Sequence, residues 1–569
     1  MIERKRRRHT ARQSLGWCAA AIAVATAVAA TGCSSNNSGG GNGTPGNFVR
    51  VGTLDSVQSF DFWTTDDTLL DDTAAMIYPL LVQYNLQTKG FEPDFATTWR
   101  TSSDGRTYTF TTRKHAEWSD GKPLTAADAA WMINTVVRLQ NGAAAALASN
   151  VVGVTSATAT SPTSLTVRFS KPESDALANL AHLPILPEHV WGAMAAGKGT
   201  ALRTAPVMPS AGHPVVSGGP FIFAKYLYNQ SMVLLRNPHY YGSPAHVSGI
   251  GIEFFSNDDA MVAAVQANQV DAALGNPNIP PTDVHPLKAA GMRIFSPEGI
   301  ALNDLIINTN PAKTRHRELL NPVVREAFEY AIDRATIDKI AFLGYAQAGS
   351  SLVPPATGKW YDPAVKPLPY SLSKANALLN QAGYKMGPNG IRIADGHPMS
   401  YTVLLSPDNG PEGVRTGQIM TTDFAKIGVR LNFQPIGDNA LNSAIYANHY
   451  RNFDMAMWGW DAQIDPNYIL DVVTCSQWYN NSDSGYCNKR YDALYREQAA
   501  TVNQAKRLKI VYQMQEMLFN ARPYIILQYL PALEGWNPKW CDVTVSPDGW
   551  FNSLTNDPQT SIRLCHAGS

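Results

Sequence analysis

Residues 454–469 read DMAMWGWDAQIDPNYI, an alternating segment that passes into a polar loop. The alternation predicts a strand with two methionines on one face and both tryptophans on the other. The Asp, Gln, Pro and Asn residues that follow cannot continue a ladder and favour a loop. Tryptophans beside a carboxylate suit an amine that carries an apolar group, because an ammonium is attracted to both. We predict ligand contacts from four side chains of this segment: Trp458, Trp460, Asp461 and Gln463. The alternative is a core strand with a surface turn.

The length and charge of the chain limit the classes of protein that fit. A chain of 569 residues exceeds one hydrophobic core, so two to four domains or lobes are expected. The 44% hydrophobic and 16% charged content is that of an ordinary folded protein. Without residues 1–32, 40 basic and 45 acidic side chains remain, a net charge of about −5. This balance argues against nucleic acid as a partner.

The N-terminus has the pattern of an export signal. Residues 1–32 hold a basic stretch up to Arg12 and then an apolar stretch at 15–30, which is short for a membrane span. The small residues before Cys33 resemble a bacterial lipobox, in which the cysteine is lipidated, although Ala30 stands where leucine is usual. Residues 33–47 form a Gly/Ser/Asn-rich tether. We expect an extracytoplasmic protein, anchored by lipid to the outer face of the cytoplasmic membrane. The alternative is ordinary secretion.

Four cysteines follow Cys33 in a chain expected to fold in an oxidising compartment. They allow three pairings, of which we favour Cys475–Cys487 and Cys541–Cys565. Metal binding by these cysteines is the weaker alternative, because no CxxC or HxxxH spacing accompanies them.

The pattern along the chain predicts an α/β protein. The first half is rich in short strands, with one helix opened by the capping pair Thr125 and Asp128. In the second half, a helix begins at Asn321-Pro322, and strands at 401–405 and 429–433 flank a helix at 412–427. This change from a strand-rich half to a half with alternating helices and strands favours two lobes with a cleft between them.

The chain lacks the motifs of common catalytic sites. There is no GxSxG, HExxH, Walker A or GxGxxG pattern, and the twelve histidines are scattered. Single histidines such as His189 and His316 are interpreted as structural. We therefore expect no enzyme, no bound metal and no cofactor.

Several separated segments resemble one family in the family's own order. They are FATTW at 95–99, SSDGRTYTF at 102–110, AEWSDGKPLTAAD at 116–128, SGGPF at 217–221, LRNPHYY at 235–241, VREAFEYAIDR at 324–334 and ANALLNQAGY at 375–384. Together they resemble the large extracytoplasmic solute-binding proteins (family 5) of ABC importers for oligopeptides, dipeptides and nickel.

The resemblance implies a type II periplasmic-binding-protein clamp with two hinge strands. Lobe one would comprise 48–300 with an extra subdomain at about 75–215, lobe two 301–527, and 528–569 would return to lobe one. The chain would cross between the lobes near 296–304 and 525–532.

The implied function is that of a monomeric, lipid-anchored receptor, which captures di- or oligopeptides and delivers them to ABC permease subunits with their ATPases. Three alternatives remain open. The same fold could bind a non-peptide solute such as haem, a nickel chelate, an oligosaccharide or an opine. The chain could be a sensor lipoprotein, or a secreted hydrolase.

The resemblance also implies where a peptide would be held. Trp460 matches the tryptophan that precedes the family's amine-binding aspartate, but the loop is one residue shorter here, so the position falls near Asp461 or Gln463. Five further residues are candidates for ligand contact: Phe62, Trp63, Ser217, Gly218 and Gly219. Arg415 is a candidate for the ligand's carboxylate, with a solvent-facing arginine as the alternative.

Overall fold

The computed structural model describes residues 47–565, except 56, 58, 66, 67, 206, 207, 210–214, 276–278, 448 and 451. The described residues belong to one compact unit. The expected signal peptide, Cys33 and the tether up to residue 46 lie outside the described residues. In the part that is described, no helix has both the length and the apolar character that crossing a membrane requires.

The core of lobe one is a mixed seven-stranded sheet. Its strands lie in the order β10 (Phe221–Leu227), β11 (Ser231–Arg236), β12 (Gly249–Phe254), β1 (Phe48–Thr53), β13 (Ala272–Leu274), β23 (Glu534–Trp536) and β14 (Arg293–Phe295). β1 is parallel to both of its neighbours, and β23 brings the C-terminal segment back into this sheet.

A second sheet of lobe one lies within residues 75–215, where the resemblance implies an extra subdomain. Its antiparallel strands lie in the order β4 (Ala96–Thr101), β5 (Thr107–Thr112), β9 (Ser164–Phe169) and β8 (Val154–Ser161). Helix α2 (Ala126–Leu139) packs on it through the core of lobe one. The predicted capping box is confirmed, because Thr125 caps α2 and Asp128 bonds back to the backbone of Thr125.

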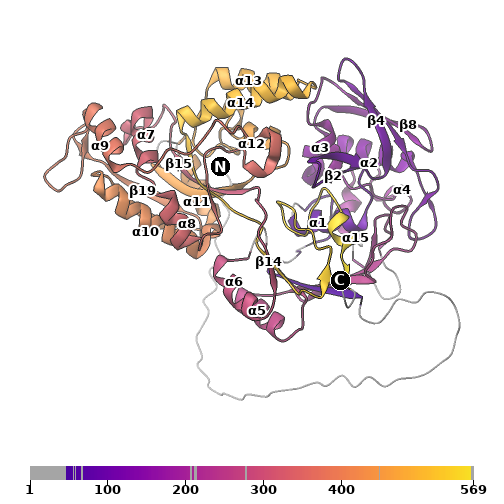
Figure 1. Cartoon of the computed structure of the whole chain (residues 1–569). Helices are drawn as coiled ribbons and strands as arrows, with labels where there is room; N and C mark the ends of the chain where they lie inside the picture. The colour runs from indigo at the N-terminus through magenta and orange to yellow at the C-terminus, as the bar shows by residue number, and fades with distance from the viewer. Residues whose placement is uncertain are drawn as a thin grey trace, which may run out of the picture. The chain divides into compact units, whose positions relative to one another are not determined.

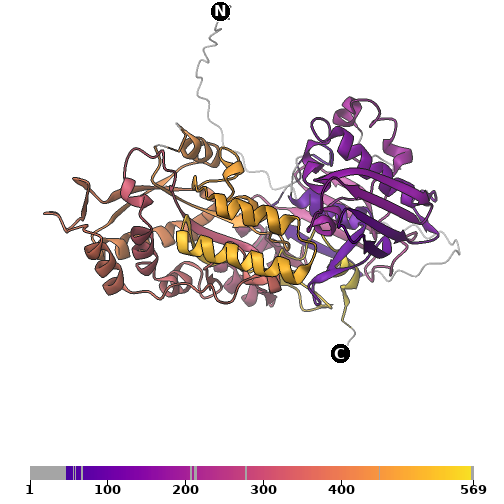
Figure 2. The ribbon, with the colours of Figure 1, turned by 90° about the horizontal axis from the view of Figure 1, so that it is seen from above.

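Lobe two is built on a six-stranded sheet. Its strands lie in the order β16 (Gln347–Ala348), β22 (Tyr524–Tyr529), β15 (Ala301–Ile307), β21 (Met455–Asp461), β19 (Ser400–Leu405) and β20 (Arg430–Pro435). Helices cover both faces of this sheet, in the α/β arrangement that the sequence predicts (Figures 1 and 2). One layer comprises α7 (Pro322–Tyr330), α8 (Arg334–Ala341), α9 (Leu372–Gln381) and α10 (Gly410–Lys426). The other comprises α11 (Asp438–Tyr446), α12 (Asn467–Asp471), α13 (Lys489–Ala499) and α14 (Gln504–Ala521).

β21 confirms the alternation predicted for residues 454–460. Met455 and Met457 belong to the core under α7–α10. Ala456, Trp458 and Trp460 belong to the core under α14. The strand therefore separates the two cores of lobe two.

The chain crosses between the lobe sheets twice. β14 ends at Phe295 and β15 begins at Ala301, whereas β22 ends at Tyr529 and β23 begins at Glu534. Two short segments, 296–300 and 530–533, thus join the lobes close to the residues that the resemblance indicates. The fold is the two-lobed clamp that the resemblance implies.

Shorter elements complete the lobes. Four two-stranded ribbons are β2 (Val82–Asn85) with β3 (Gly90–Pro93), β6 (Ala116–Glu117) with β7 (Pro123–Leu124), β17 (Ile393–Ala394) with β18 (His397–Pro398), and β24 (Trp540–Cys541) with β25 (Arg563–Leu564). The remaining α-helices are α1 (Thr68–Ile77), α3 (Ala176–Ala181), α4 (Glu188–Trp191), α5 (Asp258–Gln266), α6 (Val284–Ala289) and α15 (Asp557–Ser561). Both predicted disulfides, Cys475–Cys487 and Cys541–Cys565, are present.

Candidate functional site

The end of β21 lies where the two lobes are joined. Asp461, its last residue, pairs in register with Ala301, the first residue of β15. The carbonyl of Ile300, in the first crossing, accepts a hydrogen bond from the Ala462 amide at 3.1 Å. The Ile300 amide in turn donates to the carbonyl of Pro547 at 3.2 Å. This backbone chain brings the loop after β21 beside the C-terminal turn at 546–549.

Three carboxylates from separate segments converge at this junction. We call them the carboxylate cluster: Asp72 on α1, Asp461 on β21 and Asp548 in the C-terminal turn. Desolvation, followed by repulsion from Asp461, raises the pKa of Asp548 to about 7. Burial of Asp72 raises its pKa well above the usual range, with further repulsion from Asp548, Asp71 and Asp55. Both lobes therefore contribute negative charge to one place.

Asp461 is the member of the cluster that solvent reaches best. Its side chain is exposed, yet the surrounding protein desolvates it enough to raise its pKa. No basic side chain in the described part of the chain lowers the pKa of any of the three cluster carboxylates. A cationic ligand would supply the missing counter-charge.

The two tryptophans of β21 lie on the strand that ends at Asp461. Trp458 and Trp460 are both half-buried against the α14 core. The Trp460 ring meets Tyr468 edge-on, with centroids 6.5 Å apart. Its indole nitrogen is buried and lacks a hydrogen-bond partner among the described residues. Gln463, two residues beyond Asp461, is exposed.

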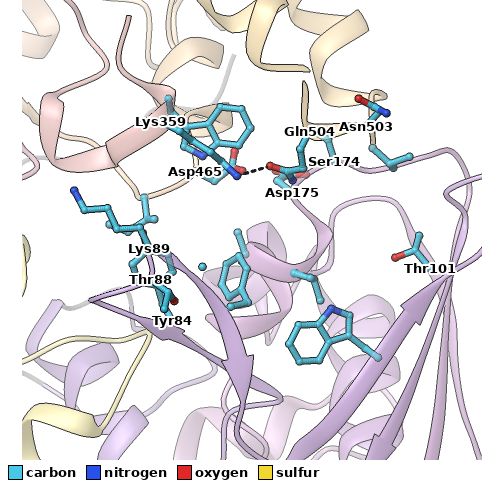
Figure 3. Close-up of a pocket in the computed structure, with 18 of the residues that line it drawn as sticks. Tyr84, Thr88, Lys89, Thr101, Ser174, Asp175, Lys359, Asp465, Asn503 and Gln504 are labelled. Atoms are coloured by element: carbon cyan, nitrogen blue, oxygen red, sulfur yellow. Dashed lines mark hydrogen bonds between the residues drawn. The ribbon is translucent and has the colours of Figure 1, made fainter. Parts of the chain in front are cut away.

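A cavity of about 870 Å³ lies between lobe one and lobe two next to this loop (Figure 3). Lobe one lines it with residues of the β2–β3 ribbon and of sheet strand β4, including Lys89 and Trp99. Lobe two contributes Trp360, Lys359 and the loop residue Asp465. Lys359 donates to the side chain of Gln504 at 2.8 Å, the contact drawn in Figure 3. The lining is thus mixed: aromatic rings stand beside two lysines, the carboxylates of Asp175 and Asp465, and neutral polar side chains.

Direct contacts join the lobes at one side of this cavity. Arg507 on α14, which is fully buried, binds both oxygens of Asp465 at 2.6 Å within lobe two and donates to the Ser174 carbonyl of lobe one at 3.5 Å. The Asn467 amide donates to Asp175 of lobe one at 2.7 Å. The Ser174 amide of lobe one donates to the carbonyl of Ala499 at 2.8 Å.

The structure gives Phe62 and Trp63 a packing role that corrects their assignment to the ligand. Phe62 is 4% exposed and Trp63 is fully buried in the core of lobe one. The Trp63 ring lies 6.1 Å from the rings of both Trp131 and Trp191. Side chains with no accessible surface offer no contact to a ligand.

The Ser217–Gly219 segment is likewise structural. Ser217 is fully buried, and the amides of Gly218 and Gly219 both donate to the carbonyl of Ile77. A Cβ at Gly218 would lie 2.7 Å from the Trp118 ring, and one at Gly219 would lie 2.6 Å from a backbone oxygen. Glycine is required here for close packing on the end of α1.

Arg415 forms a helix-surface ion pair. It lies 3.2 Å from Glu412 on α10 and also donates to the Ala341 carbonyl of α8. The Arg415 guanidinium is therefore bonded to Glu412 and Ala341 of the protein, where we considered a ligand carboxylate. Among the sequence candidates, the structure therefore brings together only the β21 group near the lobe junction.

Sequence reasoning missed Asp72 and Asp548 as partners of Asp461. Asp72 was interpreted only as half of an adjacent carboxylate pair, and Asp548 belongs to a segment without a motif. Their approach depends on the return of the chain to lobe one through β23.

Known proteins match nearly the whole described chain. Residues 90–481 match the family described as "Bacterial extracellular solute-binding proteins, family 5 Middle". The chain belongs to this family. The description of the family is that of solute-binding proteins.

The relatives that this chain resembles are named for different ligands. Heme-binding protein A of Haemophilus influenzae is 23% identical over 508 residues, which cover 85% of this chain and 87% of that protein. The dipeptide-binding protein of Escherichia coli is 24% identical over 494 residues, covering 83% and 86%. The crystal structure of NikA from Brucella suis in complex with Fe(III)-EDTA superposes with a TM-score of 0.77 at 20% identity, covering 91% of this chain and all of that one. The last comparison supports the fold alone.

Proposed function

We propose that the protein is the lipid-anchored receptor of an ABC importer and that it captures peptides between its two lobes. Family membership supports solute binding, and the carboxylate cluster at the lobe junction supports a ligand with a free amine. That cluster is the observation that carries the proposal, because three carboxylates without a basic partner at one accessible point favour a cation.

In this proposal the amino terminus of the peptide binds Asp461, with Asp548 and Asp72 behind it. The peptide then extends into the 870 Å³ cavity, which the loop residue Asp465 lines. Asp461 and Asp465 are four residues apart, so their Cα atoms lie within about 14 Å of each other. A peptide of a few residues spans this distance.

The cavity suits the rest of a peptide. Trp99 and Trp360 offer apolar surface to side chains, and Lys89 and Lys359 offer positive charge to the carboxyl terminus. A roomy, mixed lining favours peptides of varied sequence, because water can fill the space that a small side chain leaves.

Residues 1–47 complete the proposal. Cleavage before Cys33 and acylation of its thiol would anchor the chain, and the tether would let the lobes reach the permease. The protein acts as a monomer that presents its ligand to permease subunits with their ATPases.

Native mass spectrometry of the purified protein tests the ligand class. We expect a series of bound masses matching peptides of mixed sequence, and a rise in unfolding temperature on addition of peptide pools. A rise with haem, a sugar or a nickel chelate, and none with peptides, would contradict the ligand assignment while leaving the family intact.

A further inference from the structure

Two histidines and a glutamate meet at the end of the lobe-two sheet that lies farther from the crossings. His316 precedes the short helix η4 (Arg317–Leu320), which contains Glu318. His397 opens strand β18. The fold thus brings together two histidines that lie far apart in the sequence.

The coordinating atoms of these side chains face one another. One such atom from each residue lies within 4.8 Å of the other two. Nδ1 of His316 is 3.2 Å from Oε1 of Glu318, and Nε2 of His397 is 3.8 Å from Oε2 of the same carboxylate. The imidazole rings are nearly perpendicular, with centroids 4.8 Å apart.

One oxygen of the Glu318 carboxylate is fixed by hydrogen bonds, and its second oxygen lacks a hydrogen-bond partner among the described residues. Its side chain is fully buried, and Oε1 accepts a hydrogen bond from the Tyr401 hydroxyl at 2.8 Å. Oε2 is buried and has no hydrogen-bond partner among the described residues. A buried carboxylate oxygen without a partner is costly, and a bound cation would satisfy it. The Tyr401 hydrogen bond is the kind of outer contact that orients a metal ligand.

The neighbouring basic groups are bound elsewhere. Lys313 bonds to Asp454 at 2.9 Å and to the Phe453 carbonyl. The Arg317 guanidinium donates to the carbonyls of Pro311 and Lys313. Neither forms an ion pair with Glu318 in the described chain, so the carboxylate remains available to a cation.

This site is separate from the proposed peptide site. His316 lies 4.0 Å from Asp454, which immediately precedes β21, whereas Asp461 ends that strand. At about 3.3 Å per residue, the two ends of β21 are roughly 20 Å apart.

We propose that His316, His397 and Glu318 bind one divalent transition-metal ion of the zinc class. Imidazole nitrogen and carboxylate oxygen suit such an ion, and three protein ligands leave coordination positions open. A solvent-accessible cavity of about 570 Å³, lined by both histidines and by Ser400, leaves room there for water or an external ligand. Tetrahedral bonding places donor atoms about 3.4 Å apart. Small side-chain rotations therefore suffice to close the site around the metal.

The bound metal would join the β17–β18 ribbon to η4. Because the ligands come from two distant parts of the chain, the metal binds only the folded form and raises the stability of lobe two.

Titration with Zn²⁺ against a chromophoric chelator tests the proposal. The full-length chain is purified without a polyhistidine tag, in detergent because of the apolar stretch at 15–30. We expect one equivalent of Zn²⁺ per chain with a dissociation constant in the micromolar range or below. Co²⁺ at the same site should give the visible absorption bands of a low-symmetry complex.

Three variants locate the site. His397→Gln changes a side chain that is 37% exposed and should lower Zn²⁺ affinity at least about tenfold without unfolding the chain. His316→Asn should do the same, and asparagine tolerates the left-handed backbone at this position, where φ is 50°. His189→Gln is the control, since His189 faces the single carboxylate of Asp120 and should leave the affinity unchanged.

Two results would overturn the proposal. One is the absence of Zn²⁺ and Co²⁺ binding at micromolar concentration. The other is unchanged affinity in folded His397→Gln and His316→Asn proteins.

Discussion

Asp461 and Asp465 lie four residues apart on the loop that follows β21, yet their surroundings are opposite. Asp465 binds a fully buried arginine, Arg507, through both oxygens and accepts the amide of Asn467. Asp461 is exposed, has no basic partner in the described chain, and repels Asp548. The Asp465 carboxylate is bound within the fold, whereas the Asp461 carboxylate is available to a ligand.

The difference separates structural charge from functional charge. A buried ion pair satisfies both partners and fixes the loop. Carboxylates that repel one another at an accessible point cost stability, and they persist where a ligand uses them. We therefore give Asp465 a structural role within lobe two, and we propose ligand capture for Asp461.

The largest expected effect comes from Arg507→Ala. The substitution leaves Asp465 without its counter-charge in a half-buried position, and it removes the packing of the guanidinium on the Trp360 ring. We expect a loss of about 3–5 kcal/mol in the free energy of unfolding, measured by urea denaturation. A loss below about 1 kcal/mol would mean that Asp465 does not have the structural role given to it here.

Asp548→Asn should change the pH dependence of stability. The folded-state pKa of Asp548 is raised to about 7 from 3.8, so its contribution to stability is present at low pH and is lost as the pH rises through 7. We expect the unliganded protein to lose about 1 kcal/mol between pH 6 and pH 8 through this group.

The measurement compares urea denaturation of the wild type and Asp548→Asn at both pH values. Asp483 and Glu534 also have pKa values raised to about 7 by burial, so only the difference between the two proteins reports Asp548. If the free energy of unfolding depends on pH in the same way in both proteins, Asp548 does not have the raised pKa that the carboxylate cluster implies.

The smallest effect is expected for Arg415→Ala. Arg415 pairs with Glu412 one helical turn away, and about a third of its side chain is exposed. Such pairs contribute about 0.3–0.5 kcal/mol. The variant is thus a matched arginine control for Arg507→Ala, and equal losses in the two would remove the contrast between buried and exposed pairs.

Much of the fold could be predicted because its signals are local. The capping box at Thr125, the alternation in β21 and the proline after Asn321 each determine an element from neighbouring residues. Of the three pairings that four cysteines allow, the favoured one, which joins cysteines close in sequence, is confirmed.

Of the candidate site, the sequence predicted only the residues on β21 and in the loop that follows it. Motif residues such as Ser217 and Trp63 proved to be packing positions, because glycine-rich turns and tryptophans serve a core as readily as a ligand. Asp548 with Asp72, and His316 with His397, meet only through tertiary structure. The spacing of these residues along the chain does not predict such contacts.

Calorimetric titration of a peptide with the wild type and Asp461→Asn, each with free and acetylated amino terminus, tests the central claim most directly. A charge-assisted hydrogen bond contributes about 1.5–3 kcal/mol. We predict that Asp461→Asn weakens binding of the free-amine peptide about 10- to 100-fold and hardly changes binding of the acetylated one. Equal losses for both peptides, or no loss for either, would contradict the assignment of Asp461 to the ligand's amine.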